Sequence, residues 1–157
     1  MIYLIGSLAN KKIVQITKTL RDEGFDVFSE WMASGEGADQ RWWDYFQALG
    51  IGFDEAINSP FVNTAFNFDL NHLDSADTVV MVMPAGRSAG IELGYALGKG
   101  KLGYVLFDGE PERPDLMIKL ATGIFYSLEE LVKQLKANAY SDSDYSESYR
   151  QYTGEYP

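Results

Sequence analysis

A carboxylate follows a buried strand and a short loop in the middle of the chain. Residues 78–83 form an apolar run between Asp77 and Pro84, and a loop of small residues then leads to Glu92. An apolar run of this length indicates a central strand of a parallel sheet, and open α/β sheets bind ligands beyond the carboxyl ends of their strands. We expect Glu92 in the first turn of the next helix, where the helix dipole favours the anion. An ionised carboxylate held there can act as a nucleophile.

The elements that must position Glu92 alternate between strands and helices. The sequence predicts strands at residues 2–5, 25–28, 78–83, 102–107 and 123–126. It predicts helices at 11–23, within 53–75 with a break at 58–60, at 90–98, and from a capping box at 127–130 to about 138. Residues 29–52 indicate an irregular insertion with a short helix at 42–49. This order predicts an α/β protein with a flavodoxin-like, doubly wound, five-stranded parallel sheet and helices on both faces.

Composition limits the classes of protein to consider. The 157 residues suffice for one domain with its own core, and their net charge of −10 argues against a nucleic-acid polymer as partner. The chain has no Cys, which fits a reducing compartment such as the cytoplasm. We expect no membrane span and no signal peptide, because no apolar run is long enough. The single His, His72, has no partner at ligand spacing, so we expect neither a metal nor a cofactor.

The residues around Glu92 resemble a known family. An Asp on a helix, Asp69, precedes Ala76 and Asp77, then come the apolar strand and the small-residue loop, and then Glu92-Leu93-Gly94-Tyr95-Ala96. Their joint order and spacing resemble the nucleoside 2-deoxyribosyltransferase superfamily, which includes the 2′-deoxynucleoside 5′-monophosphate N-hydrolases. The N-terminal residues 2–8 are similar to the first strand and loop of the hydrolase branch. The resemblance is good over residues 64–107 and looser over residues 1–30.

The resemblance implies cleavage of an N-glycosidic bond. Glu92 would be the nucleophile that traps the sugar at C1′, and Asp69 would be the acid that protonates the departing base, with the two carboxyl groups about 5 Å apart. Tyr3 lies on the first strand, which is central in such a sheet, so its hydroxyl could orient Glu92. The alternative is that these are a solvated helix Glu, an ordinary helix Asp and a half-buried strand Tyr.

Two loops at the same edge of the sheet are expected to bind substrate. Gly6, Ser7 and Asn10 form a turn before a helix, and the second loop offers its donors through Gly86, Arg87 and Ser88. In the nucleotide hydrolases the first loop supplies an Arg to the phosphate, but Ala9 stands at that position here. A substrate with or without a 5′-phosphate therefore stays open. Some aromatic residues could also stack on the base, from the set Trp31, Trp42, Trp43, Phe46 and Phe66.

Several alternatives remain at this point. The sugar could pass to another base or to water, the enzyme could instead be an NAD-cleaving or other nucleotide glycosidase, or the protein could bind nucleotides without turnover. The G-x-G-x-x-G match at residues 98–103 is rejected, because it leads from a helix into a strand. We expect residues 1–139 to form the deoxyribosyltransferase-like domain, and 140–157 to be an extended or disordered acidic tail rich in Tyr and Ser. The resemblance implies a homodimer or higher homo-oligomer.

Overall fold

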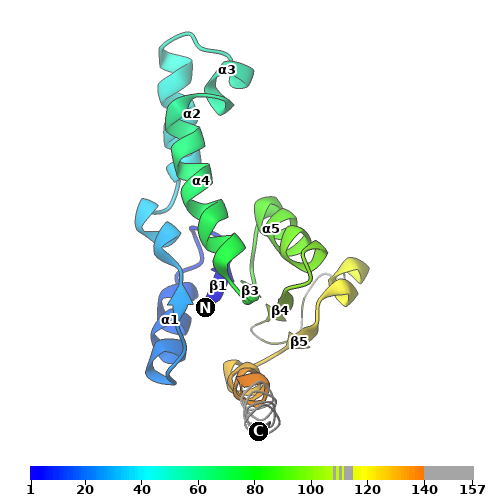
Figure 1. Ribbon diagram of the computed structural model, residues 1–157. Helices are drawn as coiled ribbons and strands as arrows, with labels where there is room; N and C mark the ends of the chain where they lie inside the picture. Colours follow the sequence, from blue (N-terminus) through cyan, green and yellow to red (C-terminus); the bar gives the residue numbers. More distant parts are fainter. Residues whose placement is uncertain (108, 110, 112–114, 140–157) are drawn as a thin grey trace, which may run out of the picture.

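Five parallel strands form the centre of the molecule, as the computed structural model shows for residues 1–107, 109, 111 and 115–139 (Figure 1). Their spatial order is β2-β1-β3-β4-β5. The strands are β1 (Ile2–Ile5), β2 (Val27–Phe28), β3 (Thr78–Val82), β4 (Leu102–Leu106) and β5 (Gly123–Phe125). This is the flavodoxin-like order, and the predicted fold class is confirmed.

Alternate strand residues face two different helix layers. Leu4 and Val80 pack in one apolar cluster with α1 (Lys12–Asp22) and with the helical residues 128–139. Tyr3 and Val79 pack in the other cluster, with α4 (Pro60–Ser75) and α5 (Arg87–Gly98). The period of two along each strand therefore directs Tyr3 to the face covered by the helices that contain Asp69 and Glu92.

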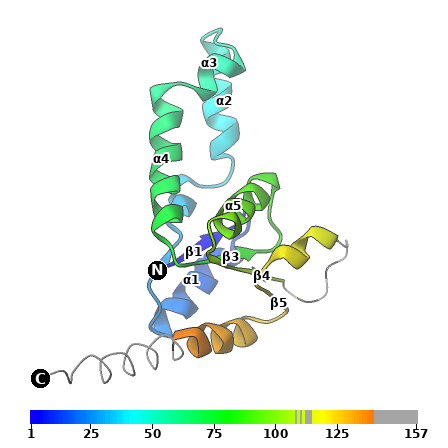
Figure 2. The same cartoon turned by 45° about the vertical axis from the view of Figure 1, so that its right-hand side comes forward.

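A helical arm projects from the sheet (Figures 1 and 2). It consists of α2 (Ala38–Ala48), α3 (Phe53–Ile57) and the N-terminal half of α4, and these are called the arm below. The expected break at residues 58–60 is confirmed, since α3 ends before it and Pro60 begins α4 after an N-cap at Ser59. The sheet, the other helices and the C-terminal half of α4 are called the body.

Two helix boundaries differ from the sequence prediction. The insertion at 29–52 is more regular than expected, because η1 (Glu30–Ser34) and the eleven residues of α2 fill most of it. The α5 helix starts at Arg87, three residues before the expected Gly90. Its first turn contains Ala89, which is 1% exposed and packs on the sheet, so burial stabilises helix in a stretch whose composition suggested a loop.

The last helix of the described part begins at a side-chain cap. The Ser127 N-cap of the predicted capping box is present, since the Glu130 N–H donates to Ser127 Oγ at 3.3 Å. The predicted acidic tail, 140–157, lies outside the described residues. Within the described residues no helix has the length and apolar character that crossing a membrane requires.

Candidate active site

The structure brings Tyr3, Glu92 and Asp69 together on one face of the sheet. Tyr3 comes from β1, Glu92 from the second turn of α5, and Asp69 from the C-terminal half of α4. Tyr3 is 2% exposed, and the two carboxyl groups are half-buried. All three side chains interact electrostatically, and the Tyr3 hydroxyl is close enough to Glu92 for a hydrogen bond to influence both groups.

The electrostatics of this cluster depart from those of surface carboxylates. Burial, followed by the negative charge of Asp69, raises the pKa of Glu92 to about 7, while the hydrogen bond from Tyr3 opposes that shift. Burial also raises the pKa of Asp69, with a smaller opposing effect of His72. Burial and the two carboxylates raise the pKa of Tyr3 well above its usual value, so its hydroxyl stays a donor. Buried carboxyl groups with raised pKa values are a common feature of catalytic sites.

The prediction that the helix dipole favours the Glu92 anion is wrong. Because α5 begins at Arg87, Glu92 is the sixth residue of the helix, and the first turn contains no acidic residue. The helix dipole acts mainly within the first turn. Burial and a neighbouring carboxylate therefore govern the Glu92 pKa and raise it, and the Tyr3 hydroxyl is the group that favours the anion.

Several polar groups of the first predicted binding loop already have hydrogen-bond partners within the protein. Asn10 is 6% exposed, and its side-chain amide donates to Val82 O at 3.4 Å and Pro84 O at 3.3 Å. Its Oδ1 accepts from the Lys12 N–H, and Ser7 Oγ accepts from the Ala9 N–H, both at 3.2 Å. Asn10 thus joins the loop after β1 to the loop after β3, and several donors of the expected anion site already have partners.

Gly6 in this loop has a packing role. A Cβ there would clash with Ile13 Cδ1, so a larger residue would require the Ile13 side chain of α1 to move. The second predicted loop is more open. Gly86 caps α5 in an extended conformation, and Arg87 and Ser88 are exposed at its first two positions.

Comparison with known proteins supports this fold. No protein-family model and no curated protein sequence matches the chain. Among solved structures, a match with a TM-score of 0.56 and 23% sequence identity covers 83% of this chain and 89% of the other. The matched protein is a 2-deoxyribosyltransferase. It comes from the psychrotolerant bacterium Bacillus psychrosaccharolyticus and is described as a biocatalyst for nucleoside synthesis.

The structure separates the aromatic residues that were candidates for base stacking. Trp42 and Trp43 contact each other and Phe53 within the arm, and Phe46 contacts Trp42 edge-on. The Trp31 Nε1–H donates to Leu4 O at 2.8 Å, and its ring packs against both core clusters. Phe66 is 59% exposed on α4, close in sequence to Asp69. Phe66 is therefore the one member of this set that is exposed.

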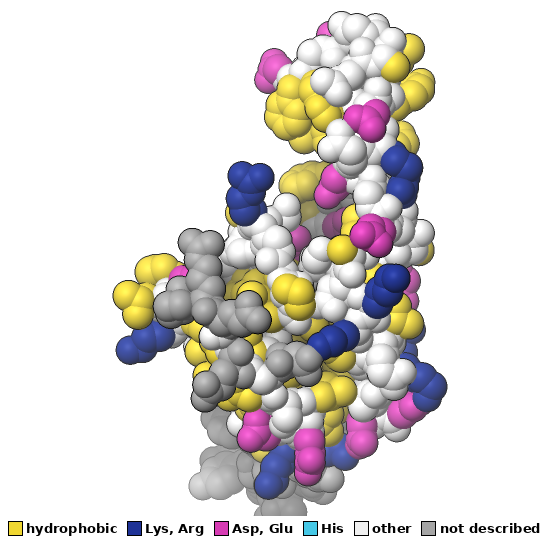
Figure 3. Space-filling model, turned by 180° about the vertical axis from the view of Figure 1, so that it is seen from behind, with side chains coloured by type: hydrophobic (Ala, Val, Ile, Leu, Met, Phe, Trp, Pro, Cys, Tyr) yellow, Lys and Arg dark blue, Asp and Glu magenta, His cyan; other side chains and the backbone are white. Residues whose placement is uncertain are grey.

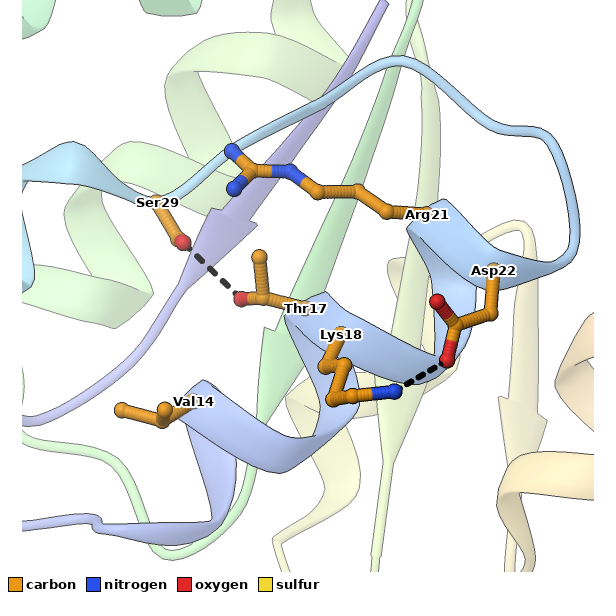
Figure 4. A pocket seen from close by; sticks show the side chains of 6 residues that line it. All are labelled: Val14, Thr17, Lys18, Arg21, Asp22 and Ser29. Atoms are coloured by element: carbon orange, nitrogen blue, oxygen red, sulfur yellow. Dashed lines mark hydrogen bonds and ion pairs between the residues drawn. The ribbon is translucent and has the colours of Figure 1, made fainter.

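The molecule is hollowed between the arm and the rest of the surface. The space-filling view shows a notch there, with acidic side chains in it (Figure 3). A separate hollow of about 400 Å³ lies along α1, on the opposite face of the sheet from Glu92 (Figure 4). Its polar groups are paired, Thr17 with Ser29 at 2.8 Å and Lys18 with Asp22 at 2.5 Å, so it offers no comparable chemistry.

Sequence reasoning missed two rings beside the cluster. Phe28 of β2 stacks on Tyr3, with ring centroids 5.2 Å apart, and His72 of α4 stacks on Phe28 at 3.9 Å. The i, i+3 spacing of Asp69 and His72 puts both on one side of α4 and could have indicated the second ring. Among the described residues no group of three or more His, Asp or Glu is arranged to hold a metal ion.

Proposed function

We propose that this protein cleaves the N-glycosidic bond of a deoxyribonucleoside or its 5′-monophosphate through a covalent intermediate on Glu92. The observation that supports this most strongly is the half-buried pair Glu92 and Asp69 beside the buried Tyr3 hydroxyl. Two carboxyl groups with different environments can divide the roles of nucleophile and acid. The resemblance around Glu92 and the fold shared with a 2-deoxyribosyltransferase support the same chemistry.

The first step forms one bond and breaks one. A carboxylate oxygen of Glu92 attacks C1′ of the sugar, and the electrons of the C1′–N bond pass to the base nitrogen. Asp69 donates its proton to the leaving base. The Tyr3 hydroxyl, which stays protonated, holds Glu92 in place and favours the charge on it.

The second step returns Glu92 to its starting state. A second base, or water, attacks C1′ and displaces the Glu92 carboxylate, and the proton of the attacking nitrogen or water passes to Asp69. A site that excludes water and binds free bases gives a transferase, and an open site gives a hydrolase. The protein with the similar structure is a transferase, which favours transfer to a second base.

The substrate would be held by the loops at the carboxyl edge of the sheet. The backbone N–H groups of Gly86, Arg87 and Ser88 lie at the beginning of α5, and the Arg87 side chain could pair with an anion. Gly6, Ser7 and Asn10 shape the opposite wall. Asn10 would act by joining the two loops, because its side chain is already bonded.

Residues 1–139 would form the catalytic unit and would assemble as a homodimer or a multiple of it. The arm exposes large apolar side chains, which a neighbouring copy could cover: Tyr45, Leu49, Phe53, Ile57, Phe61 and Phe66. The lack of Cys keeps the cytoplasm as the proposed location.

The test is a panel of deoxynucleosides, their 5′-monophosphates, ribonucleosides and NAD, each incubated with the protein and analysed for free base by chromatography. We expect base release from a deoxyribose substrate and a new nucleoside when a second base is added. Release from NAD alone would instead favour a nucleotide glycosidase of another kind. Binding of a nucleoside without any release would favour a protein that does not catalyse turnover.

A further inference from the structure

A stack of three rings joins the strand that contains Tyr3 to the helix that contains Asp69. The Tyr3 and Phe28 rings lie 5.2 Å apart at 24°, and the Phe28 and His72 rings lie 3.9 Å apart at 13°. Phe28 is 5% exposed, so the middle ring is fixed in the core. The stack therefore runs from β1 through β2 to α4.

The His72 ring is also fixed to its own helix. Its Nδ1 lies 2.7 Å from the carbonyl oxygen of Phe68, one turn earlier. Because a carbonyl can only accept, Nδ1 is the nitrogen that holds the hydrogen. The Phe68 ring lies 4.5 Å from the His72 ring and 5.8 Å from the Phe28 ring, so the imidazole contacts two aromatic rings. Rotation of His72 would break a hydrogen bond and two ring contacts together.

Asp69 precedes His72 by three residues, so the two side chains lie on the same side of α4. A shift of this turn of α4 relative to β1 would move Asp69 relative to Tyr3 and Glu92. A hollow of about 560 Å³ at the β2 edge is lined on this side by Phe28, Phe68 and His72, and Tyr3 does not reach it. The stack thus also forms the wall between that hollow and the cluster.

From this geometry we propose that His72 is a positioning residue, whose ring, stacked on Phe28, holds α4 and Asp69 in register with Tyr3 and Glu92. The proposal rests on the proposed function, because the register matters only if Asp69 and Glu92 act on one substrate. His72 would act through ring contact, and its ability to gain or lose a proton is not required. The effect of the imidazole on the Asp69 pKa agrees with the nearness of the two side chains.

The first measurement needs no activity, because His72 is the only His in the chain. Its ring protons therefore give the single imidazole signals in a proton NMR spectrum. Stacking on Phe28 predicts that these signals move upfield of the values of an exposed His, and that Phe28→Leu returns them toward those values. Signals at the exposed values in the unaltered protein would overturn the stack.

The second measurement follows the register itself. His72→Ala should shift the backbone amide signals of Tyr3, Asp69 and Glu92, and His72→Phe, which keeps a flat ring, should restore them. The two variants should also differ in their kinetics. His72→Ala should lower kcat on the order of tenfold with KM nearly unchanged, and His72→Phe should recover the kcat of the unaltered protein. The matched control is Tyr126→Ala, which removes a ring stacked on Phe107 at 5.9 Å elsewhere on the sheet.

The outcomes separate this proposal from the proposed function. Amide shifts that follow the predicted pattern in a protein without base release would contradict the function and leave the positioning role in place. Base release with full kcat in His72→Ala would contradict the positioning role and leave the function in place. An equal loss in His72→Ala and Tyr126→Ala would also contradict it, since a general loss of packing would then explain both.

Discussion

The body and the arm place polar and apolar groups in opposite ways. In the body the large side chains that are fully buried come from the strands and from the helices packed on them, yet the carboxyl groups of Glu92 and Asp69 are half-buried there. In the arm Phe46 and Ala56 are buried, while Phe61 and neighbouring large apolar side chains are exposed. Partly burying a carboxyl group costs free energy, and so does leaving an aromatic ring in water.

This difference between the body and the arm indicates that the two regions have different functions. A protein tolerates half-buried carboxyl groups where their raised pKa values serve a reaction, and we therefore propose that the body contains the reaction site. Exposed apolar surface is typical of a face that another molecule covers, and we therefore propose that the arm contains the assembly surface. Substitutions in the body should therefore change turnover, and substitutions in the arm should change association.

The largest expected effect belongs to Glu92. Glu92→Ala should lower base release by about 10³-fold or more, because no other group can form the covalent intermediate. The matched control is Glu55→Ala in α3, an exposed arm carboxylate whose removal should leave turnover within about twofold of the unaltered protein. Both rates are measured with a chromatographic assay of free base. Equal rates for the two variants would remove the distinction between body and arm.

Asp69→Asn should have the next largest effect. Release of natural bases should fall by about 10²-fold, since the amide cannot supply a proton to the leaving nitrogen. A sugar that bears a leaving group of low basicity, such as a nitrophenolate, should be cleaved almost as fast as by the unaltered protein. If both substrates slowed equally, Asp69 would position the sugar and would not act as the acid.

The half-buried Glu92 carboxylate should lower the free energy of unfolding at neutral and higher pH. A carboxyl group whose pKa is about 7 in the folded protein and 4.5 in the unfolded chain binds more protons in the folded state between those pH values. Stability is therefore lost as the pH rises from about 4.5 to 7, and the full cost remains above that. Glu92→Gln should be more stable than the unaltered protein by on the order of 2 kcal/mol at pH 8, a value discounted for partial solvent exposure. Urea unfolding at pH 4 should show almost no difference, and a stabilisation that is the same at both pH values would contradict the raised pKa.

The smallest expected effect concerns the arm. Replacing Phe61 and Phe66 by Ser should weaken self-association by about tenfold, which corresponds to about 1.4 kcal/mol, without changing the fold of the body. The control is Leu116→Ser, which removes an 81% exposed apolar side chain from η2 (Leu116–Leu120) in the body. Light scattering over a range of micromolar concentrations measures the mass of each variant. A monomer at all concentrations in the unaltered protein would remove the arm's proposed role.

The sequence predicted the body better than the arm for a physical reason. Apolar runs such as β3 and turn residues such as Gly24, at a φ of +90°, are local signals, so the strand order and most boundaries are confirmed. The start of α5 at Arg87 depends on the burial of Ala89 against the sheet, which is a tertiary contact. The length of α2 depends on aromatic contacts with α3 and α4.

In the candidate site, too, the features that depend on tertiary contacts could not be predicted from the sequence. Glu92 could be proposed from residue types and order, Asp69 and Tyr3 followed from the resemblance to a known family, and the structure brings the three together. The raised pKa of Glu92 could not be predicted from the sequence, because it depends on burial and on Asp69, which lies 23 positions earlier in the chain. The ring stack was missed for the same reason, since Phe28 and His72 meet only when α4 packs beside β2.

The central claim, that Glu92 bonds to the sugar, is tested most directly by mass spectrometry of the protein after incubation with a 2-deoxy-2-fluoro nucleoside. The fluorine destabilises the oxocarbenium-like transition state and slows the loss of the sugar from a glycosyl–Glu ester. We predict a mass increase of one fluorosugar per chain, located after proteolysis on the peptide that contains Glu92 and absent from Glu92→Gln. Release of base with no adduct, or an adduct on any other residue, would contradict the claim.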